Sequence, residues 1–298
     1  MADSDRKAPA PASGWVFKPQ AEMDEKQFRQ WQMLLESRTG MSLPESRKTF
    51  LQTNLGIRMR EIGCGTYQEY FEKVISGTSG IIEWATLVDR LTVQETRFYR
   101  DPDACNLVTD YVLTRPRELL LQNSFEAWSV GCSTGEEPYT LAILLSECMS
   151  VLGLNKYFGV TGTDISTPAL EKAKNGLYSA AKLVTLDDTL KSKYFVQKED
   201  RRYEISPAIK NRVCFSRVNI LELGSAPMHG MNLIFCQNVL IYFRRWRRKE
   251  ILNRLAERLV PGGMLILGQG EIVDWSHPLL ERIPSDKALA FIRQPDKN

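Results

Sequence analysis

The first third of the chain has the hydrophobic periodicity of α-helices. Apolar residues recur every three or four positions, in stripes that cover residues 28–35, 51–62 and 84–91. Residues at this spacing lie on one face of a helix, which buries that face against other helices. Gly40, Gly63 and Gly77 follow these stripes, and glycine is favoured just beyond a helix C-terminus. We therefore expect a small helical domain over residues 21–91.

The pattern changes at residue 125 to short apolar runs separated by amphipathic stretches. The runs are residues 125–130, 157–165, 213–220, 231–239, 264–267 and 288–292. The amphipathic stretches are residues 138–149, 168–177 and 249–259. Alternating strands and helices are typical of a mostly parallel sheet with helices on both faces. Residues 92–298 are thus predicted to form a doubly wound α/β domain.

Two segments depart from this organisation. Residues 179–212 are long and charged and contain Tyr194, Phe195 and Tyr203, so we expect an inserted subdomain with a few antiparallel strands. Residues 1–20 are polar and rich in Ala, Pro and Ser, which predicts a flexible tail.

Composition narrows the function classes. The chain is 43% hydrophobic and 25% charged with a net charge of +3, which is ordinary for a globular protein and gives no argument for a nucleic-acid partner. Six scattered cysteines and two histidines form no metal-ligand spacing. No apolar run resembles a signal peptide or a membrane span. We expect a cytoplasmic protein with reduced thiols and no metal.

The candidate chemistry begins where the first predicted strand ends, at residues 131–139 (GCSTGEEPY). Gly131 and Gly135 allow a tight turn and a close approach to a ligand. Glu136 and Glu137 would repel a pyrophosphate, but they suit a ligand with positive charge, such as S-adenosylmethionine with its ammonium and sulfonium groups. The alternative is that both glutamates only complement the dipole of the following helix.

Polar residues also follow two later strands. Asp164 could accept hydrogen bonds from both ribose hydroxyls of a nucleoside; alternatively, it caps the next helix. Gln237 and Asn238 interrupt an apolar run at the same predicted edge of the sheet. The basic residues 244–249 (RRWRRK) are typical of a solvated helix face, with phosphate binding as the alternative.

Five segments together resemble one family. They are TRFYR (96–100), GCSTGEEPYT (131–140), GTDIS (162–166), FCQNVLIYF (235–243) and PGGMLILGQGE (261–271). In this order they are similar to the CheR family of chemoreceptor glutamate methyltransferases, over residues 24–292. STGEEPY and NVLIYF are the most specific segments. The resemblance implies a Rossmann-like S-adenosylmethionine-dependent methyltransferase fold. Overall likeness favours the branch that serves type IV pilus chemosensory systems (PilK-like).

The resemblance also implies residue roles. The positions that match the family's cofactor contacts are Gln94, Thr96, Arg100, Glu137, Asp164, Asn219, Ile220, Gln237 and Asn238. Tyr242 matches a tyrosine whose hydroxyl lies near the transferred methyl group, so Tyr242 and Arg100 are assigned to catalysis. Gln94, Gln237 and Ile220 depart from the usual asparagine, arginine and leucine, and the missing cation at Gln237 could alter cofactor affinity.

A methyl transfer to glutamate fits these residues. The acceptor carboxylate has an ordinary pKa of about 4.3 and is already ionised, so no general base is needed. The enzyme must align the reacting atoms and exclude water. On charge matching, Arg100 would bind the cofactor carboxylate and Glu137 its ammonium, while Asp164 takes the ribose. Tyr242 would orient the substrate or the sulfonium.

The expected partner is a chemoreceptor. Arg47, Asn54 and Arg58 share a face of the predicted helix 45–62, so Arg47 and Arg58 could steer the glutamate-bearing methylation helices of the receptor. An ordinary solvated face is the alternative. The inserted subdomain is expected to contact the receptor too. We expect a monomer that reaches the membrane only through the receptor.

Two rival functions remain at this point. One is a methyltransferase acting on RNA or a small molecule, which the basic run suggests and the absent nucleobase-methylation signature disfavours. The other is a non-catalytic scaffold that binds S-adenosylmethionine. This chain retains Arg100, Glu137, Asp164 and Tyr242 at the positions that match the family, which argues against a degenerate site and favours an enzyme.

Overall fold

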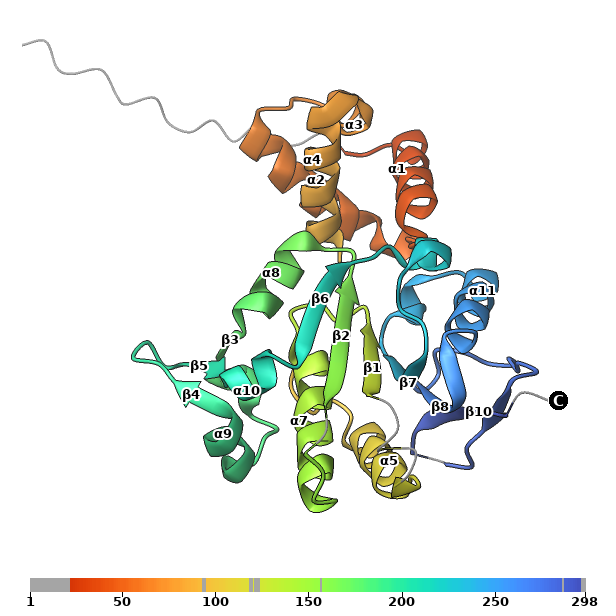
Figure 1. Ribbon diagram of the computed structural model, residues 1–298. Coiled ribbons are helices and arrows are strands. Elements are labelled where there is room, and N and C mark those ends of the chain that lie inside the picture. Colours follow the sequence, from red (N-terminus) through yellow and green to blue (C-terminus); the bar gives the residue numbers. More distant parts are fainter. Residues whose placement is uncertain are drawn as a thin grey trace, which may run out of the picture.

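The chain folds into a helical domain that sits above one end of a larger α/β domain (Figure 1). The computed structural model describes residues 22–92, 95–117, 120, 124–155, 157–285 and 287–295. The predicted tail, residues 1–20, lies outside the described residues.

The predicted stripes form the core of the helical domain. Its elements are α1 (Glu25–Thr39), a 3₁₀ turn η1 (Glu45–Arg47), α2 (Lys48–Ile62), α3 (Tyr67–Ile75) and α4 (Gly77–Leu91). Trp31, Leu55 and Leu87 are fully buried where these helices meet. Asp24 caps α1 through a reciprocal capping box with Gln27, which satisfies amides that the first helical turn leaves free.

Two local predictions in this domain need correction. Gly40 and Gly63 do end α1 and α2, with φ of 76° and 72°, but Gly77 is the first residue of α4. The helix that precedes it, α3, was not predicted, because it is only nine residues long and buries just Tyr67, Tyr70 and Val74. The predicted helix 45–62 is also divided, since α2 begins at Lys48 after the 3₁₀ turn.

The α/β domain is built on a seven-stranded sheet in the order β6-β2-β1-β7-β8-β10-β9. The strands are β1 (Phe125–Val130), β2 (Phe158–Asp164), β6 (Val213–Arg217), β7 (Met231–Cys236), β8 (Leu259–Leu267), β9 (Leu280–Arg282) and β10 (Leu289–Arg293). Only the pairings of β10 with β8 and β9 are antiparallel. The mostly parallel, doubly wound sheet is therefore confirmed. The three-residue β9 was not predicted.

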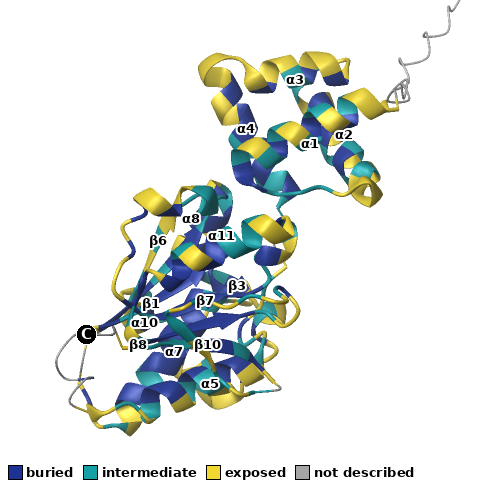
Figure 2. Ribbon diagram, turned by 90° about the vertical axis from the view of Figure 1, so that its right-hand side faces the viewer, coloured by how far each residue is buried: buried dark blue, intermediate teal, exposed yellow. Residues whose placement is uncertain are grey.

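Helices cover both faces of this sheet. They are α5 (Pro102–Leu113), α7 (Glu136–Val151), α8 (Thr167–Asn175) and α11 (Arg245–Ala256). Alternate residues of β1 serve two separate cores: Phe125 and Ala127 pack with α5 and α7, whereas Trp128 and Val130 pack with α11. Buried positions accordingly concentrate in the strands and on the inward faces of the helices (Figure 2).

The inserted subdomain is a small antiparallel sheet, as the sequence suggests. Its strands β3 (Leu177–Ser179), β5 (Arg202–Ile205) and β4 (Phe195–Gln197) pair in that order. The turn η2 (Ala180–Leu183) and the helix α9 (Asp188–Tyr194) connect β3 to β4, and α10 (Pro207–Lys210) follows β5. The first strand begins at Leu177, two residues before the predicted start. Lys193 and Tyr194 both contact Glu147 and so attach the subdomain to α7.

The helical domain docks onto loops that follow the carboxyl ends of the strands. The Ser42 amide donates to the Tyr242 carbonyl at 2.8 Å, and Met41 forms an antiparallel bridge with Phe243. The Asn219 side chain donates to the Arg38 carbonyl at 2.9 Å. A Cβ on Gly40 would lie 2.6 Å from the Leu221 side chain and 2.9 Å from that of Phe243. Gly40 is thus required both by its positive φ and by this close approach.

This interface predicts a difference between two glycines. Gly40→Ala should destabilise the chain more than Gly63→Ala, since both have a left-handed φ but nothing lies within 4 Å of a Cβ at Gly63. We expect about 1 kcal/mol for Gly63→Ala from backbone strain, and about 1–3 kcal/mol more for Gly40→Ala from overpacking. Urea unfolding measures both. Equal losses would contradict the tight contact at Gly40.

Candidate cofactor-binding and active site

A cleft with two connected lobes lies at the carboxyl ends of β1, β2 and β7. Ligands bind at this edge in doubly wound sheets, where the strand order reverses. The lobes have empty volumes of about 850 and 970 Å³. Gly131, Ser133, Asn238 and Tyr242 border both lobes, so the cleft is continuous past these four residues.

The first lobe, here called the interdomain lobe, is walled by both domains. The helical domain contributes Thr39, Met41, Leu91 and Thr92; the α/β domain contributes Val130, Thr163, Asp164, Ile165, Ala169, Val218, Asn219, Ile220, Leu223, Val239 and Phe243. Most of these side chains are apolar. The lobe suits a flat, weakly polar group, with Asp164 and Asn219 among its polar positions.

The second lobe, here called the polar lobe, is lined by side chains of both charges. The segment between the domains supplies Glu95, Thr96, Arg97, Tyr99, Arg100 and Asp101, and the α/β domain supplies Glu137, Thr140 and Gln237 among others. Cations and carboxylates facing one space suit a zwitterion such as an amino acid. Gln94, also predicted to bind the cofactor, lies outside the described residues.

The two glutamates at the start of α7 have different environments. Glu136 is fully buried; it accepts from Thr134 Oγ1 at 2.7 Å and pairs with Lys182 Nζ of the inserted subdomain at 3.1 Å. Glu137 lines the polar lobe, and its Oε1 accepts from Ser129 Oγ at 2.7 Å. Of the two, Glu137 is therefore the one placed to receive a ligand's ammonium group.

Burial raises the pKa of Glu137 to about 8, assisted by the nearby charge of Glu271, while the Ser129 hydroxyl and the Arg100 guanidinium act in the opposite direction. Without a bound ligand, burial thus favours the neutral form of Glu137. A bound ammonium would favour the carboxylate and lower that pKa.

Asp164 is held by backbone amides in the interdomain lobe. Its two carboxylate oxygens accept from Ser133 N at 2.8 Å and from Ser166 N at 2.9 Å. Each oxygen keeps a free lone pair for a ribose hydroxyl. Burial raises the pKa of Asp164, and these backbone hydrogen bonds oppose that rise. The N-cap alternative is wrong, because Ser166 Oγ caps α8 by accepting from Ala169 N at 3.1 Å.

Arg100 and Gln237 both line the polar lobe, but they differ in how many hydrogen-bonding groups remain available to a ligand. The exposed Arg100 makes a hydrogen bond to the Glu95 carbonyl at 2.9 Å, which leaves most of its donors available. Gln237 is buried, and its Nε2 already donates to Asp101 Oδ2 at 2.8 Å and to the Leu267 carbonyl at 3.3 Å. Only its amide oxygen remains for a ligand.

Asn219 and Ile220 form part of the wall of the interdomain lobe. The Asn219 amide is used inside the protein: Oδ1 accepts from Leu221 N at 3.1 Å, which caps the 3₁₀ turn η3 (Ile220–Ser225), and Nδ2 donates to Arg38. The predicted contact at Asn219 is therefore one that shapes the lobe, with a spare lone pair on Oδ1 for a ligand.

Backbone strain concentrates around the polar lobe. Among the described non-glycine residues, five have positive φ, and three of these, Tyr99, Ser133 and Asn238, line this lobe with φ of 48°, 49° and 60°. Such strained conformations persist where the surrounding structure holds them in place, and they are common at functional sites. Ser133 Oγ is also buried without a hydrogen-bond partner. Ser133 was not predicted, and its place in the GCSTG turn was the only available signal.

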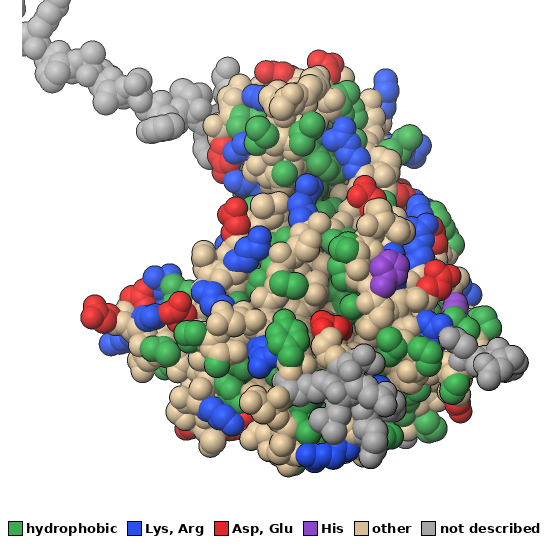
Figure 3. Space-filling model, viewed as in Figure 1, with side chains coloured by type: hydrophobic (Ala, Val, Ile, Leu, Met, Phe, Trp, Pro, Cys, Tyr) green, Lys and Arg blue, Asp and Glu red, His purple; other side chains and the backbone are tan. Residues whose placement is uncertain are grey.

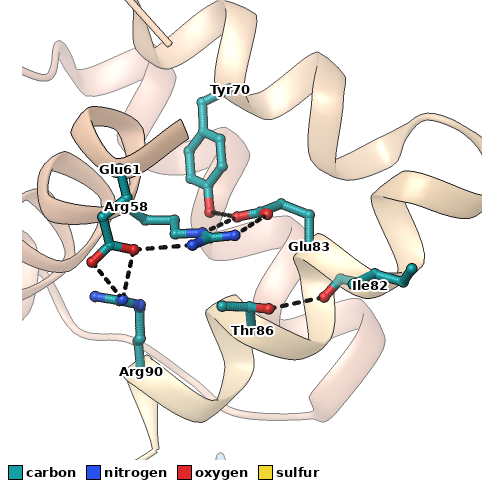
Figure 4. Close-up of polar contacts among 7 residues, drawn as sticks. All are labelled: Arg58, Glu61, Tyr70, Ile82, Glu83, Thr86 and Arg90. Atoms are coloured by element: carbon teal, nitrogen blue, oxygen red, sulfur yellow. Dashed lines mark hydrogen bonds and ion pairs between the residues drawn. The ribbon is translucent and has the colours of Figure 1, made fainter. Parts of the chain in front are cut away.

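Arg58 does not present a free cation. Its guanidinium donates to both Glu83 oxygens at 2.7 and 2.8 Å and to Glu61 at 3.0 Å, while Tyr70 also donates to Glu83 (Figure 4). These hydrogen bonds, that of Arg58 first, lower the pKa of Glu83 against its burial. Arg58 therefore joins α2 to α4, and its role in receptor steering stays a prediction.

Arg47, unlike Arg58, presents an exposed guanidinium. It is exposed at the start of α2, with its guanidinium 5.9 Å from the Phe50 ring centre. Burial raises the pKa of Tyr242, and the charges of Arg47 and Arg100 are the main opposing influences. Arg47 thus lies close enough to the cleft to act on groups inside it.

The basic run 244–249 is mostly paired within the protein. Arg244 pairs with Glu36 at 2.5 Å, Arg245 with Asp274 at 2.9 Å and Arg247 with Glu250 at 2.5 Å. Arg248 donates to three backbone carbonyls. Lys and Arg side chains are also interspersed with Asp and Glu on the face in Figure 3. These pairings disfavour the phosphate-binding alternative.

The fold and the cleft define an S-adenosylmethionine-dependent methyltransferase, and the comparisons identify its family. The model of the CheR methyltransferase, all-alpha domain, matches residues 26–92, and that of the CheR methyltransferase, SAM binding domain, matches residues 94–289. The chain belongs to the CheR methyltransferase family. Its cofactor is S-adenosylmethionine.

Relatives with the same printed function cover most of the chain. A chemotaxis protein methyltransferase from Borreliella burgdorferi is 30% identical over 78% of this chain and 83% of its own length. The Escherichia coli chemotaxis protein methyltransferase is 30% identical over 87% of both chains. In the described part of the chain, no helix is long and apolar enough to cross a membrane.

The raised pKa of Glu137 predicts proton release on cofactor binding. Below pH 8 the protonated carboxyl must ionise to pair with the ligand ammonium, so S-adenosylhomocysteine affinity should rise with pH from 6 to 7.5. Isothermal titration calorimetry in buffers of different ionisation enthalpy measures the protons released. Glu137→Gln should bind more weakly and release no proton. Proton release equal to wild type in Glu137→Gln would remove Glu137 from this role.

Proposed function

We propose that the chain transfers a methyl group from S-adenosylmethionine to glutamate side chains on the cytoplasmic methylation helices of a chemoreceptor. The observation that carries this proposal is the composition of the cleft. Glu137, Asp164 and the unpartnered Ser133 hydroxyl suit a zwitterionic nucleoside. No histidine lines the described part of either lobe, and an already ionised carboxylate is a nucleophile that needs no base.

The chemistry is a single displacement. A carboxylate oxygen forms a bond to the methyl carbon as the carbon–sulfur bond breaks, and its electron pair stays on sulfur, giving a methyl ester and S-adenosylhomocysteine. The bound cofactor supplies the activated methyl group. Glu137 holds the ammonium, Arg100 the carboxylate and Asp164 the ribose. Tyr242, which borders both lobes, orients the incoming carboxylate beside the reacting centre.

Arg47 supports an acidic protein substrate. Its charge, at the end of η1 just before α2, acts electrostatically on Tyr242, whereas Arg58 is committed to Glu61 and Glu83. An exposed cation beside the cleft would attract the glutamates of a receptor helix and repel cationic substrates. The pilus branch, the monomeric state, cytoplasmic location and receptor contact by the inserted subdomain stay predictions.

The methylated group can be identified directly. Wild-type chain incubated with tritiated S-adenosylmethionine and candidate receptors should label receptor, and mild alkali should release the label as volatile methanol, because a carboxyl methyl ester hydrolyses. Alkali-stable label would instead indicate a methylated amine or nucleobase. Tight cofactor binding without label on any candidate receptor would favour the non-catalytic scaffold.

Steering by Arg47 can be tested against a matched arginine on α2, the helix that Arg47 precedes. Arg47→Glu should lower kcat/KM on receptor, and the loss should shrink in high salt because the interaction is screened. Arg60→Glu makes the same charge change at an exposed position near the other end of α2 and should have a smaller effect. S-adenosylhomocysteine affinity should stay unchanged in both. Equal losses from the two variants would leave Arg47 without a specific role.

A further inference from the structure

The loop that carries Tyr242 is held by a buried carboxylate that belongs to a distant part of the sequence. Glu271 is 2% exposed. Its Oε1 accepts from Leu240 N at 3.0 Å, and its Oε2 accepts from Gly268 N at 2.8 Å. Burial raises the pKa of Glu271, and hydrogen bonds from the amides of Gly268, Asn238, Ile241 and Leu240 oppose that rise. The carboxylate thus gathers the amides at the start of the 3₁₀ turn η4 (Leu240–Tyr242).

Arg248 holds the opposite end of the same turn. Its Nε donates to the Phe243 carbonyl at 2.8 Å, and its Nη2 lies 3.4 Å from the Ile241 carbonyl. Its Nη1 donates to the backbone carbonyl of Glu271 at 2.7 Å, which ties the two anchors together. An anion therefore meets the free amides and a cation the free carbonyls, as the dipole of a helical turn favours.

The turn needs such support. It is only three residues long, and its own hydrogen bonds are Tyr242 N to the Val239 carbonyl at 3.3 Å and Phe243 N to the Leu240 carbonyl at 3.0 Å. It follows Asn238, whose φ of 60° is strained. The Ile241 side chain is 50% exposed and adds little packing. Without outside anchors, a turn of this size would sample several conformations.

We propose that Glu271 and Arg248 are positioning residues that fix the Asn238–Phe243 turn and thereby hold the Tyr242 ring between the two lobes of the cleft. This inference rests on the proposed function, because it assigns Tyr242 to the methyl-transfer step. It also gives a role to Glu271, the buried acid of the PGGMLILGQGE segment. Arg248 gains a role too; it is the one arginine of the basic run that pairs with no carboxylate in the described residues.

Gly268 provides independent support. A Cβ on this residue would lie 2.4 Å from Glu271 Oε2 and 2.8 Å from its carboxyl carbon. The end of β8 therefore comes close enough for the Gly268 amide to bind the carboxylate only because residue 268 has no side chain. Gly268→Ala should push Glu271 away from Leu240 without changing any charge.

The test compares Glu271→Gln, Arg248→Lys and Gly268→Ala with Arg245→Ala. Arg245 belongs to the same basic run, but its ion pair with Asp274 is exposed and worth little. Each of the first three variants should lower kcat on receptor about 10- to 100-fold, as expected when a catalytic group moves by about 1 Å. KM and S-adenosylhomocysteine affinity should change much less. Arg245→Ala should match wild type.

A double-mutant cycle separates positioning from general damage. If Glu271 acts through Tyr242, Glu271→Gln combined with Tyr242→Phe should be no slower than Tyr242→Phe alone. Additive losses, or equal losses of kcat and cofactor affinity, would overturn the proposal. Amide hydrogen exchange at Leu240 and Ile241 gives a readout without activity, and it should accelerate in Glu271→Gln. Unchanged exchange would overturn the proposal even if the wild type methylates no receptor, an outcome that would overturn only the proposed function.

Discussion

The backbone pairing of Met41 and Ser42 with Tyr242 and Phe243 is the contact on which the site depends. It joins the helical domain to the loop after β7, next to the tyrosine that borders both lobes. Without this pairing, the interdomain lobe would lose Thr39 and Met41 from its wall and open to water. The tight fit at Gly40 and the Asn219 hydrogen bond to Arg38 reinforce the same joint. The helical domain is thus part of the cofactor site, although none of its described residues that line either lobe is charged.

The burial of the cleft also affects the pKa values of the carboxyl groups inside it. Burial raises the pKa of both Glu137 and Asp164, and each is prepared differently for its ligand. Asp164 accepts hydrogen bonds from two backbone amides, which favour its ionised form. Glu137 accepts a hydrogen bond from a serine hydroxyl, and a bound cation would favour its ionised form further. A carboxyl group that ionises on binding distinguishes a ligand with an ammonium from one without it.

The sequence predicts those features that depend on local pattern. The strand β1 coincides with the predicted run 125–130, and the polar residues beyond β1, β2 and β7 do meet at one edge of the sheet, as the rule for parallel strands requires. Features that depend on contacts distant in sequence were missed. The hydrogen bond between Arg58 and Glu83 joins residues that are 25 positions apart, and the one between Leu240 and Glu271 joins residues that are 31 positions apart. Periodicity cannot report such pairs, since it describes only which face of an element is buried.

The most direct test of this account is a crystal structure of the chain with S-adenosylhomocysteine and a receptor-helix peptide that contains a methylatable glutamate. The account predicts the ligand's ammonium beside Glu137, its ribose hydroxyls on Asp164 and its adenine in the interdomain lobe. The peptide carboxylate should face the sulfur next to Tyr242, with the helix passing Arg47. A ligand bound in the reverse direction, or a peptide held away from Tyr242, would contradict it.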